Sequence, residues 1–245
     1  MLRHTGTKRT YSHNVKLASL LGLTAGFVNA AGFLGFNVLT TNVTGHAALF
    51  AESIALQDWK AARAVALWMF LFFAGAFLSG LIVFRIGRNQ RFSYVLPILI
   101  EIAILLSVTL MGYHYDYSLD AKELFAGGLL FAMGLQNSLV SMVSGSVVRT
   151  THLTGTFTDL GIELAQLSQK IKSDRTVLIS RIKLRLVIIF FFMGGALSGA
   201  YLFRSLKFYS FFIPVILLCS TLMYDVFRIT IKKYYRQFSN YKEFE

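Results

Sequence analysis

The chain has 245 residues, of which 55% are hydrophobic and only 15% are charged, and its mean hydropathy is +0.59. Soluble domains have roughly a quarter of their residues charged, so this composition excludes an ordinary soluble domain and indicates an integral membrane protein. A net charge of +12 is also common in nucleic-acid-binding proteins, but the basic residues lie mostly between long apolar blocks, where membrane topology explains them better. The single cysteine, Cys219, excludes a disulfide framework or a cysteine-based metal site within one chain.

Six apolar blocks are long enough to cross a membrane, since a hydrocarbon core of about 30 Å needs about 20 apolar residues in a helix. They are residues 17–36, 63–84, 93–112, 123–144, 184–203 and 209–229. The first block is too long for the core of a signal peptide, so we expect an uncleaved first span. Strands of a membrane barrel would alternate in short segments, and these blocks do not. The sequence therefore predicts an all-α, polytopic transmembrane helical bundle.

The basic residues predict the orientation, because short cytoplasmic loops of membrane proteins are rich in Lys and Arg. The N-terminus, the loop after the second block, the segment after the fourth block and the C-terminal tail are basic. With six crossings, all four fall on one side, and the mostly acidic loop YHYDYSLDAKE falls on the other. Arg204 and Lys207 are exceptions on that other side. We therefore expect both termini in the cytoplasm.

Four landmarks occur twice in the chain, in the same order. AGFVNAAGF at Ala25 resembles AMGLQNSLV at Ala132, TTNVTG (Thr40–Gly45, the first motif) matches TTHLTG (Thr150–Gly155, the second motif), FFAGAFLSG at Phe72 matches FFMGGALSG at Phe191, and YVLPILIE at Tyr94 matches FFIPVILL at Phe211. This order indicates a duplication. Each copy holds three spans, an odd number, so the second copy enters the membrane from the opposite side and the repeats are inverted.

The duplication predicts four parts of the chain. They are a basic cytoplasmic N-terminus (1–16), a first membrane repeat (17–115), a second membrane repeat (116–230) and a basic cytoplasmic tail (231–245). After each motif comes a stretch too short to span, AALFAESIAL or FTDLGIELAQL, which we expect to form a short half-helix. Irregular backbone followed by a half-helix is the usual build of a site in an inverted-repeat transporter. Alternatively, Thr-Gly before a helix simply caps that helix at a membrane-surface loop.

At AGFVNAAGF, TTNVTG, GLQNSLV and RTTHLTGTFTDLG the chain resembles the YoaK-like family of bacterial membrane proteins, whose function is unknown. The resemblance extends from about Lys16 to Ile229. It implies about six helices in a bacterial inner membrane and supplies no substrate. The chain departs from that family's pattern at Asn29, where many members have Asp, and at His46, where they have Asn.

The candidate solute-binding residues belong to the two motifs and to the amides of the first and fourth spans. They are Asn29, Thr40, Thr41, Thr44, Gly45, Gln136, Asn137, Thr150, Thr151, Thr154 and Gly155. Threonine hydroxyls donate and accept hydrogen bonds, and glycine permits close approach of the backbone. Buried amides can equally bond across helices, so a purely structural role for the three amides stays open.

Three acids are weaker candidates for proton or ion coupling. Glu101 is the one acid deep inside a strongly apolar span, where a charge is costly and by default marks a function. Asp159 and Glu163 lie four residues apart on the second half-helix, with His152 close by in sequence. These residue types can bind a metal, but acids early in a helix also complement its dipole, and we favour the dipole interpretation.

The sequence contains no phosphate-binding loop, nucleophile elbow or His-Glu-x-x-His motif, so we expect neither an enzyme nor a cofactor or metal. We expect a small-solute permease or secondary transporter whose motifs face a shared midplane cavity. The alternatives are a membrane interaction or scaffold protein and, more distantly, a lipid-processing enzyme that uses Glu101 or Asp159. The expected partners are the lipid bilayer and a small solute, with no nucleic acid. A homodimer is one candidate assembly, because so short a chain encloses only a small bundle.

Overall fold

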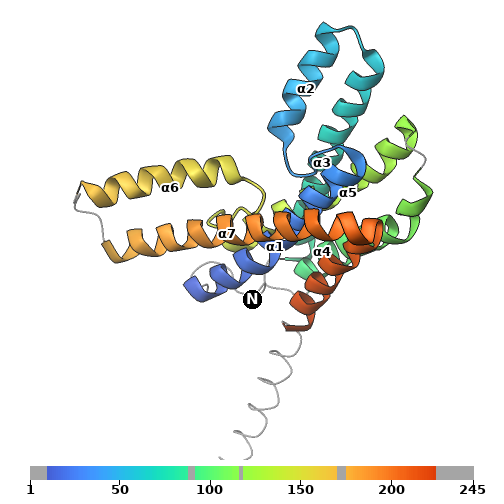
Figure 1. Ribbon diagram of the computed structural model, residues 1–245. Coiled ribbons are helices and arrows are strands. Elements are labelled where there is room, and N and C mark those ends of the chain that lie inside the picture. The colour runs from blue at the N-terminus through green and yellow to red at the C-terminus, as the bar shows by residue number, and fades with distance from the viewer. Residues whose placement is uncertain (1–9, 88–91, 116–117, 170–174, 225–245) are drawn as a thin grey trace, which may run out of the picture.

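The computed structural model describes residues 10–87, 92–115, 118–169 and 175–224, and over these ranges the chain is helical without strands (Figure 1). The elements are α1 (Tyr11–Phe36), α2 (Val43–Ala55), α3 (Trp59–Ile86), α4 (Phe92–Met111), η2 (Gly112–His114), α5 (Leu119–Ser144), α6 (Leu153–Ser168), α7 (Arg175–Leu206) and η3 (Lys207–Phe211). A last helical segment covers residues 212–224. The predicted all-α class is confirmed, and so are the two half-helices, α2 and α6.

Five helices of the described chain are long and apolar enough to cross a membrane, where the sequence predicts six. The difference lies in the last two predicted spans, 184–203 and 209–229, which fall within one helical run, Arg175–Tyr224. The run is 50 residues long, or about 75 Å as a straight helix, which is more than twice the thickness of a bilayer core. It changes direction at η3 (Figure 1), where Lys207 adopts a positive φ of 50°. Residues 225–229 of the last predicted span lie outside the described residues.

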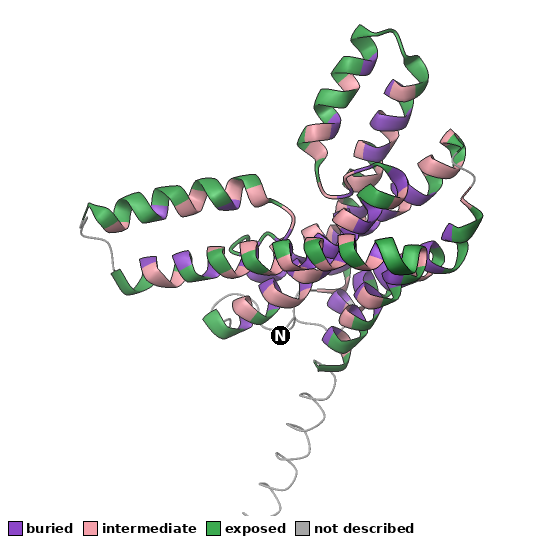
Figure 2. Cartoon of the chain, viewed as in Figure 1, coloured by how far each residue is buried: buried purple, intermediate pink, exposed green. Residues whose placement is uncertain are grey.

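The centre of the bundle is formed by α1 and α5 (Figure 2). Their most apolar windows are 61% and 67% buried inside the protein, compared with 22% for α3 and 28% for the run that contains α7. The long helices α1 and α7 pack along each other, as do α3 and α5. The more exposed α3 and α7 therefore flank the central pair and present apolar faces outward, as helices in contact with lipid do.

Close crossings at glycines hold these two helix pairs together. A Cβ atom on Gly26 of α1 would overlap the carbonyl oxygen of Phe192 of α7, and one on Gly134 of α5 would overlap the carbonyl oxygen of Phe72 of α3. Small residues at such points let helices approach until their backbones touch. Phe72 and Phe192 therefore make the same kind of contact, each with a glycine of the helix that it crosses. The sequence alignment of FFAGAFLSG with FFMGGALSG pairs Phe72 with Phe191 and is off by one residue, because the backbone contact, not the letter match, sets the register.

Two hairpin arms extend away from the centre: α2 with the first part of α3, and α6 with the first part of α7 (Figure 1). In the first arm, the side chain of Asp58 accepts a hydrogen bond from the N–H of Ala61 at 3.0 Å and caps α3. In the second arm, an ion pair described below joins the two helices. Each half-helix buries two of its own residues, His46 and Ser53 in α2, and Thr156 and Glu163 in α6.

Candidate functional site

After α1 the chain turns back toward the middle of the bundle. The C-cap residue Asn37 adopts a left-handed conformation, with φ of 54°, and ends the helix. The backbone N–H of Thr41 then donates a hydrogen bond to the side-chain oxygen of Asn29 at 3.1 Å. Asn29 lies eight residues before Asn37 (37 − 29), or about 12 Å along the helix axis. The first motif therefore lies well inside the end of α1.

After α5 the chain turns back in the same way. The C-cap residue Gly145 has φ of 64°, and the hydroxyl of Ser144 accepts a hydrogen bond from the N–H of Val148 at 3.0 Å. The side-chain nitrogen of Gln136 donates to the carbonyl of Leu21 on α1 at 2.9 Å and lies 3.4 Å from the hydroxyl of Thr150. Gln136 precedes Gly145 by nine residues (145 − 136), about 13 Å along the axis. Each motif is thus held beside a central helix by an amide side chain.

Each motif also caps the half-helix that follows it. The side chain of Asn42 accepts a hydrogen bond from the N–H of Gly45 at 2.9 Å, and the ring nitrogen Nδ1 of His152 accepts one from the N–H of Gly155 at 3.1 Å. A Cβ atom on either glycine would press on the capping side chain. The glycines are therefore explained by capping, as the alternative interpretation predicts, and the cap residue is the third of each motif rather than a threonine.

The threonines of the two motifs are buried to the same degree, position by position. Thr40 and Thr150 are completely buried, Thr41 and Thr151 are half-buried, and Thr44 and Thr154 are exposed. Asn29 and Asn137, the asparagines of the duplicated stretches AGFVNAAGF and AMGLQNSLV, are both half-buried. The two segments therefore match in burial although 110 positions separate them in the chain (150 − 40).

Three buried oxygen atoms next to the motifs have no hydrogen-bond partner among the residues that the structure describes. They are Oγ1 of Thr40, Oε1 of Gln136 and Oδ1 of Asn137. Leaving such an atom unpaired costs about 1–3 kcal/mol, so native proteins rarely do so without a reason. All three atoms can accept a hydrogen bond, so a ligand with donor groups would satisfy those at the motif where it binds.

The two motifs lie on opposite sides of the middle of α1. Thr40 packs against Gly32, because a Cβ on that glycine would be 2.7 Å from the methyl group of Thr40. Thr150 contacts Gln136, whose amide reaches Leu21. Gly32 and Leu21 are eleven residues apart (32 − 21), about 16 Å along the axis. The structure therefore places the motifs at two separate positions along one central helix.

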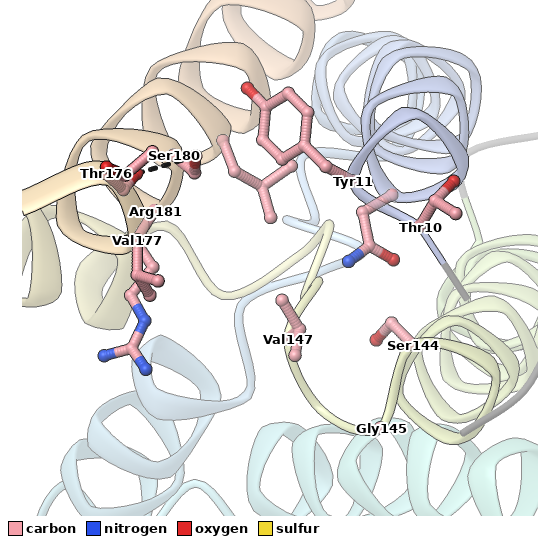
Figure 3. Close-up of a pocket in the computed structure, with 11 residues that line it drawn as sticks. Thr10, Tyr11, Ser144, Gly145, Val147, Thr176, Val177, Ser180 and Arg181 are labelled. Carbon is pink, nitrogen blue, oxygen red and sulfur yellow. Dashed lines mark hydrogen bonds between the residues drawn. The ribbon is translucent and has the colours of Figure 1, made fainter. Parts of the chain in front are cut away.

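A cavity of about 450 Å³ lies beyond the second motif, where the start of α1, the end of α5 and the first turns of α7 meet (Figure 3). Its lining includes Thr10, Ser180 and Arg181 and the loop residue Val147. No residue of either motif lines it, but Val147 precedes Thr150 by three residues. The loop that follows α5 therefore lines the cavity with Val147 and then leads into the second motif.

Asp159 and Glu163 bind an arginine that the sequence analysis did not single out. Nη2 of Arg185 on α7 lies 3.0 Å from Asp159 and 3.8 Å from Glu163, and Nη1 lies 3.5 Å from the carbonyl oxygen of Val147. Burial raises the pKa of Glu163, and Arg185 opposes that rise. Within the described ranges, no group of three His, Cys, Asp or Glu residues is arranged to hold a metal ion. The sequence signal for this ion pair was the basic first part of α7, which follows directly on the acids of α6.

Glu101 is completely buried in α4, and neither of its carboxyl oxygens has a hydrogen-bond partner in the part of the chain that the structure describes. It lies in a different helix from both motifs, and α4 packs on α5, α3 and η3.

Neither a curated protein nor a solved structure matches the chain. A family model described as "Protein of unknown function (DUF1275)" matches residues 17–224, nearly the same range as the resemblance to the YoaK-like proteins. The chain therefore belongs to the DUF1275 family.

Proposed function

We propose that the protein is a small-solute permease or secondary transporter of the bacterial inner membrane, with a site built from the two motifs. One observation carries this proposal: after each central helix, non-helical backbone turns back by about 12 Å and then starts a half-helix. Non-helical backbone is tolerated at membrane depth where it is buried in protein or lines a water-filled cavity. Transporters use such segments to bind solutes near the midplane.

We propose further that residues 17–115 and 116–230 are inverted repeats. Two pairs of crossings support this: Gly26 with Phe192 in one half-to-half contact, and Gly134 with Phe72 in the other. The equal burial of the two motifs and their equivalent caps also support it. In this topology α7 and the segment 212–224 are separate crossings joined at η3, and both termini are cytoplasmic. The two motifs then approach the midplane from opposite sides.

The side chains at the motifs favour an uncharged, polar solute. The unpaired atoms of Thr40, Gln136 and Asn137 are neutral acceptors. The charged cluster of Arg185, Asp159 and Glu163 is engaged in its own ion pairs on the α6–α7 arm. A solute with hydroxyl or amide donors would satisfy the acceptors at either motif without bringing an unpaired charge into the bundle. Motion of one half against the other would alternate access to the two motifs.

A ligand screen on purified, detergent-solubilised protein tests the proposal. The thermal midpoint is measured with sugars, polyols, amino acids, nucleosides, organic acids and ions, since a ligand that binds only the folded state must raise it. We expect a neutral polar solute to raise the midpoint in the wild type and to have no effect in Thr41→Val or Thr151→Val. The matched control is Thr158→Val, because Thr158 is exposed and bonds only to the carbonyl of Thr154 within α6. A shift that survives in both motif variants would argue against a site at the motifs.

The second candidate is a membrane interaction or scaffold protein, and the exposed tip of the α2–α3 arm favours it. Leu56 and Trp59 are 73% and 66% exposed at the turn between the two helices. Exposed apolar side chains at the end of an arm can insert into a partner or into the lipid interface. Copurification from the native membrane distinguishes these possibilities: a stoichiometric partner that is lost in a Leu56→Ser and Trp59→Ser double variant would support the scaffold.

A further inference from the structure

Glu101 faces the interior of the bundle. It lies midway between Phe92 and Met111, the ends of α4. At helical spacing it shares a face with Ile98 and Leu105, which are fully buried members of the main hydrophobic core. The neighbours Leu99 and Leu110 are exposed and mark the outer face of the same helix. The carboxyl group therefore lies among packed side chains and not at the lipid-facing side.

No charged group of the described chain is placed to neutralise this carboxyl. Ile104 of α4 lies opposite Gly128 of α5. A Cβ atom on Gly128 would be 3.5 Å from a methyl group of Ile104. Since α4 and α5 form consecutive, antiparallel helices, Glu101 is level with about residue 131 of α5. The charged residues of α5 lie in its first turns, about 12 Å or more away along the axis. They are Asp120, Lys122 and Glu123.

The other elements that pack against α4 carry their charges at their ends as well. On α3 these are Lys60 and Arg63 at the start, where Arg63 pairs with Glu123, and Arg85 in the last turn. The charged residue of η3 is Lys207, and η3 meets α4 near Gly112, where Phe208 packs. His114 of η2 is beyond the same end of α4. An ionised carboxylate without a partner in such a place is far more costly than a neutral acid.

Packing alone does not require a carboxyl group at this position. Leu218, which the sequence aligns with Glu101 in the second half, is also completely buried. A leucine thus fills the corresponding place in the segment 212–224 without any polar atom. The chain retains an unpaired acid in α4 where the matching helix has a hydrocarbon side chain, and unpaired ionisable groups inside membranes mark proton relays or ion pathways.

We propose that Glu101 is a proton-binding site inside the membrane, occupied in this conformation and emptied when the helices around α4 rearrange and admit water. Release breaks the carboxyl O–H bond and passes the proton to a water molecule, which leaves a hydrated carboxylate. Binding reverses this step. Proton exchange at Glu101 does not depend on whether the protein transports a solute. The further consequence, that the proton is the coupling ion of transport, rests on the proposed function.

Infrared spectroscopy of the full-length protein in phosphatidylethanolamine and phosphatidylglycerol vesicles tests the proposal. The C=O stretch of a protonated carboxyl group is separated from the bands of carboxylates and backbone amides, and it shifts when O–H becomes O–D. We expect a protonated-carboxyl band in the wild type that shifts after transfer to D2O and that is missing in Glu101→Gln. Glu101→Leu, which copies Leu218, must lack it as well. Asp159→Asn, which removes an acid of the α6–α7 arm, must retain it.

Two results would overturn the proposal. A wild-type spectrum identical to that of both Glu101 variants in this region would mean that Glu101 is ionised. A band that depends on Glu101 but does not shift in D2O, while the amides of α1 and α5 exchange, would make it a permanently protonated structural acid. The thermal midpoints of the variants show whether they fold. Because the infrared result needs no solute, it can fail while the ligand screen succeeds, or succeed while the screen fails.

Discussion

Gly26 of α1 and Gly195 of α7 lie at one helix crossing, and each is covered by the backbone of the opposite helix where a side chain would project. A Cβ on Gly26 would lie 2.9 Å from the carbonyl carbon of Phe192 and 3.0 Å from the nitrogen of Ala196. A Cβ on Gly195 would lie 2.8 Å from the carbonyl carbon of Leu23. The crossing is therefore closed by backbone on both sides, and a backbone cannot move aside as a flexible side chain can.

Replacing Gly195 by alanine should destabilise the protein by about 1–3 kcal/mol, because the helices must separate to admit the methyl group. The neighbouring Gly194 provides the matched control, since its Cβ would meet only the side chain of Leu23 at an ordinary 3.9 Å. Gly194→Ala should be neutral or slightly stabilising, because alanine favours the helix. The measurement is the unfolding midpoint of both variants in the same detergent. Equal losses would show that the crossing is looser than the structure indicates.

Loss of Arg185 should loosen the α6–α7 arm. Its guanidinium contacts Asp159 and Glu163 on α6 and the loop before the second motif, and Glu163 is buried. Arg185→Met should lower the free energy of unfolding by about 1–2 kcal/mol. Asp159 is half-exposed to solvent, so only Glu163 is left as a buried, unpaired acid. Faster amide exchange in α6, with little change in α2, would show the effect. Adding Glu163→Gln should restore part of the loss, and failure of this rescue would place the defect elsewhere.

Glu163 should make stability fall as the pH rises above about 4.5. Burial raises the pKa of this carboxyl, with Arg185 and Arg181 opposing the rise and Asp159 adding to it. The folded protein therefore holds the proton at a pH where the unfolded chain has released it. The stabilisation is complete below the unfolded pKa and is lost as the pH rises through the folded one. Glu163→Gln should flatten this part of the profile of unfolding free energy against pH, whereas Glu52→Gln, at an exposed position on α2, should not.

His46 should have the opposite effect at higher pH. Its ring is buried beside Trp68, with 5.8 Å between the ring centroids, and burial lowers its pKa. The unfolded chain binds a proton near pH 6.5 while the folded protein keeps the ring neutral, so stability is lost as the pH falls below about 6.5. His46→Gln should remove this loss. His152→Asn, which retains a capping side chain like that of Asn42, should leave it unchanged, and a loss that persists in His46→Gln would have another source.

The sequence predicts the features that the lipid environment requires, and it does not predict the contacts between residues that are distant in the chain. Lipid requires long apolar helices, so the first four spans end within two residues of their predictions and begin at most six residues earlier. The half-helices were also predicted, because the stretch after each motif is too short to span a membrane, but their capping residues Asn42 and His152 were not. The sequence shows that the first part of α7 is basic, but it does not single out Arg185 as the partner of Asp159, since the two are 26 positions apart (185 − 159) and only the folding of α6 onto α7 brings them together. For the same reason, sequence similarity between FFAGAFLSG and FFMGGALSG alone does not determine which of their residues meet glycines of the opposite helices.

Asn29 and Asn137 are the asparagines of the duplicated stretches in the first and fourth spans, but their side chains make different contacts. Variants at the two positions therefore distinguish a structural role from a binding role. The oxygen of Asn29 accepts the hydrogen bond from the backbone of Thr41, so Asn29→Ala should leave that N–H unpaired and destabilise the protein by about 1–3 kcal/mol. The oxygen of Asn137 has no partner among the described residues, so Asn137→Ala should change stability much less. If the motifs bind a solute, Asn137→Ala should nevertheless abolish the ligand-induced rise in the thermal midpoint. Thr158→Val provides the control, because Thr158 is exposed and bonds only to the carbonyl of Thr154 within α6. Unchanged ligand shifts in Asn137→Ala would leave this side chain with no role in binding.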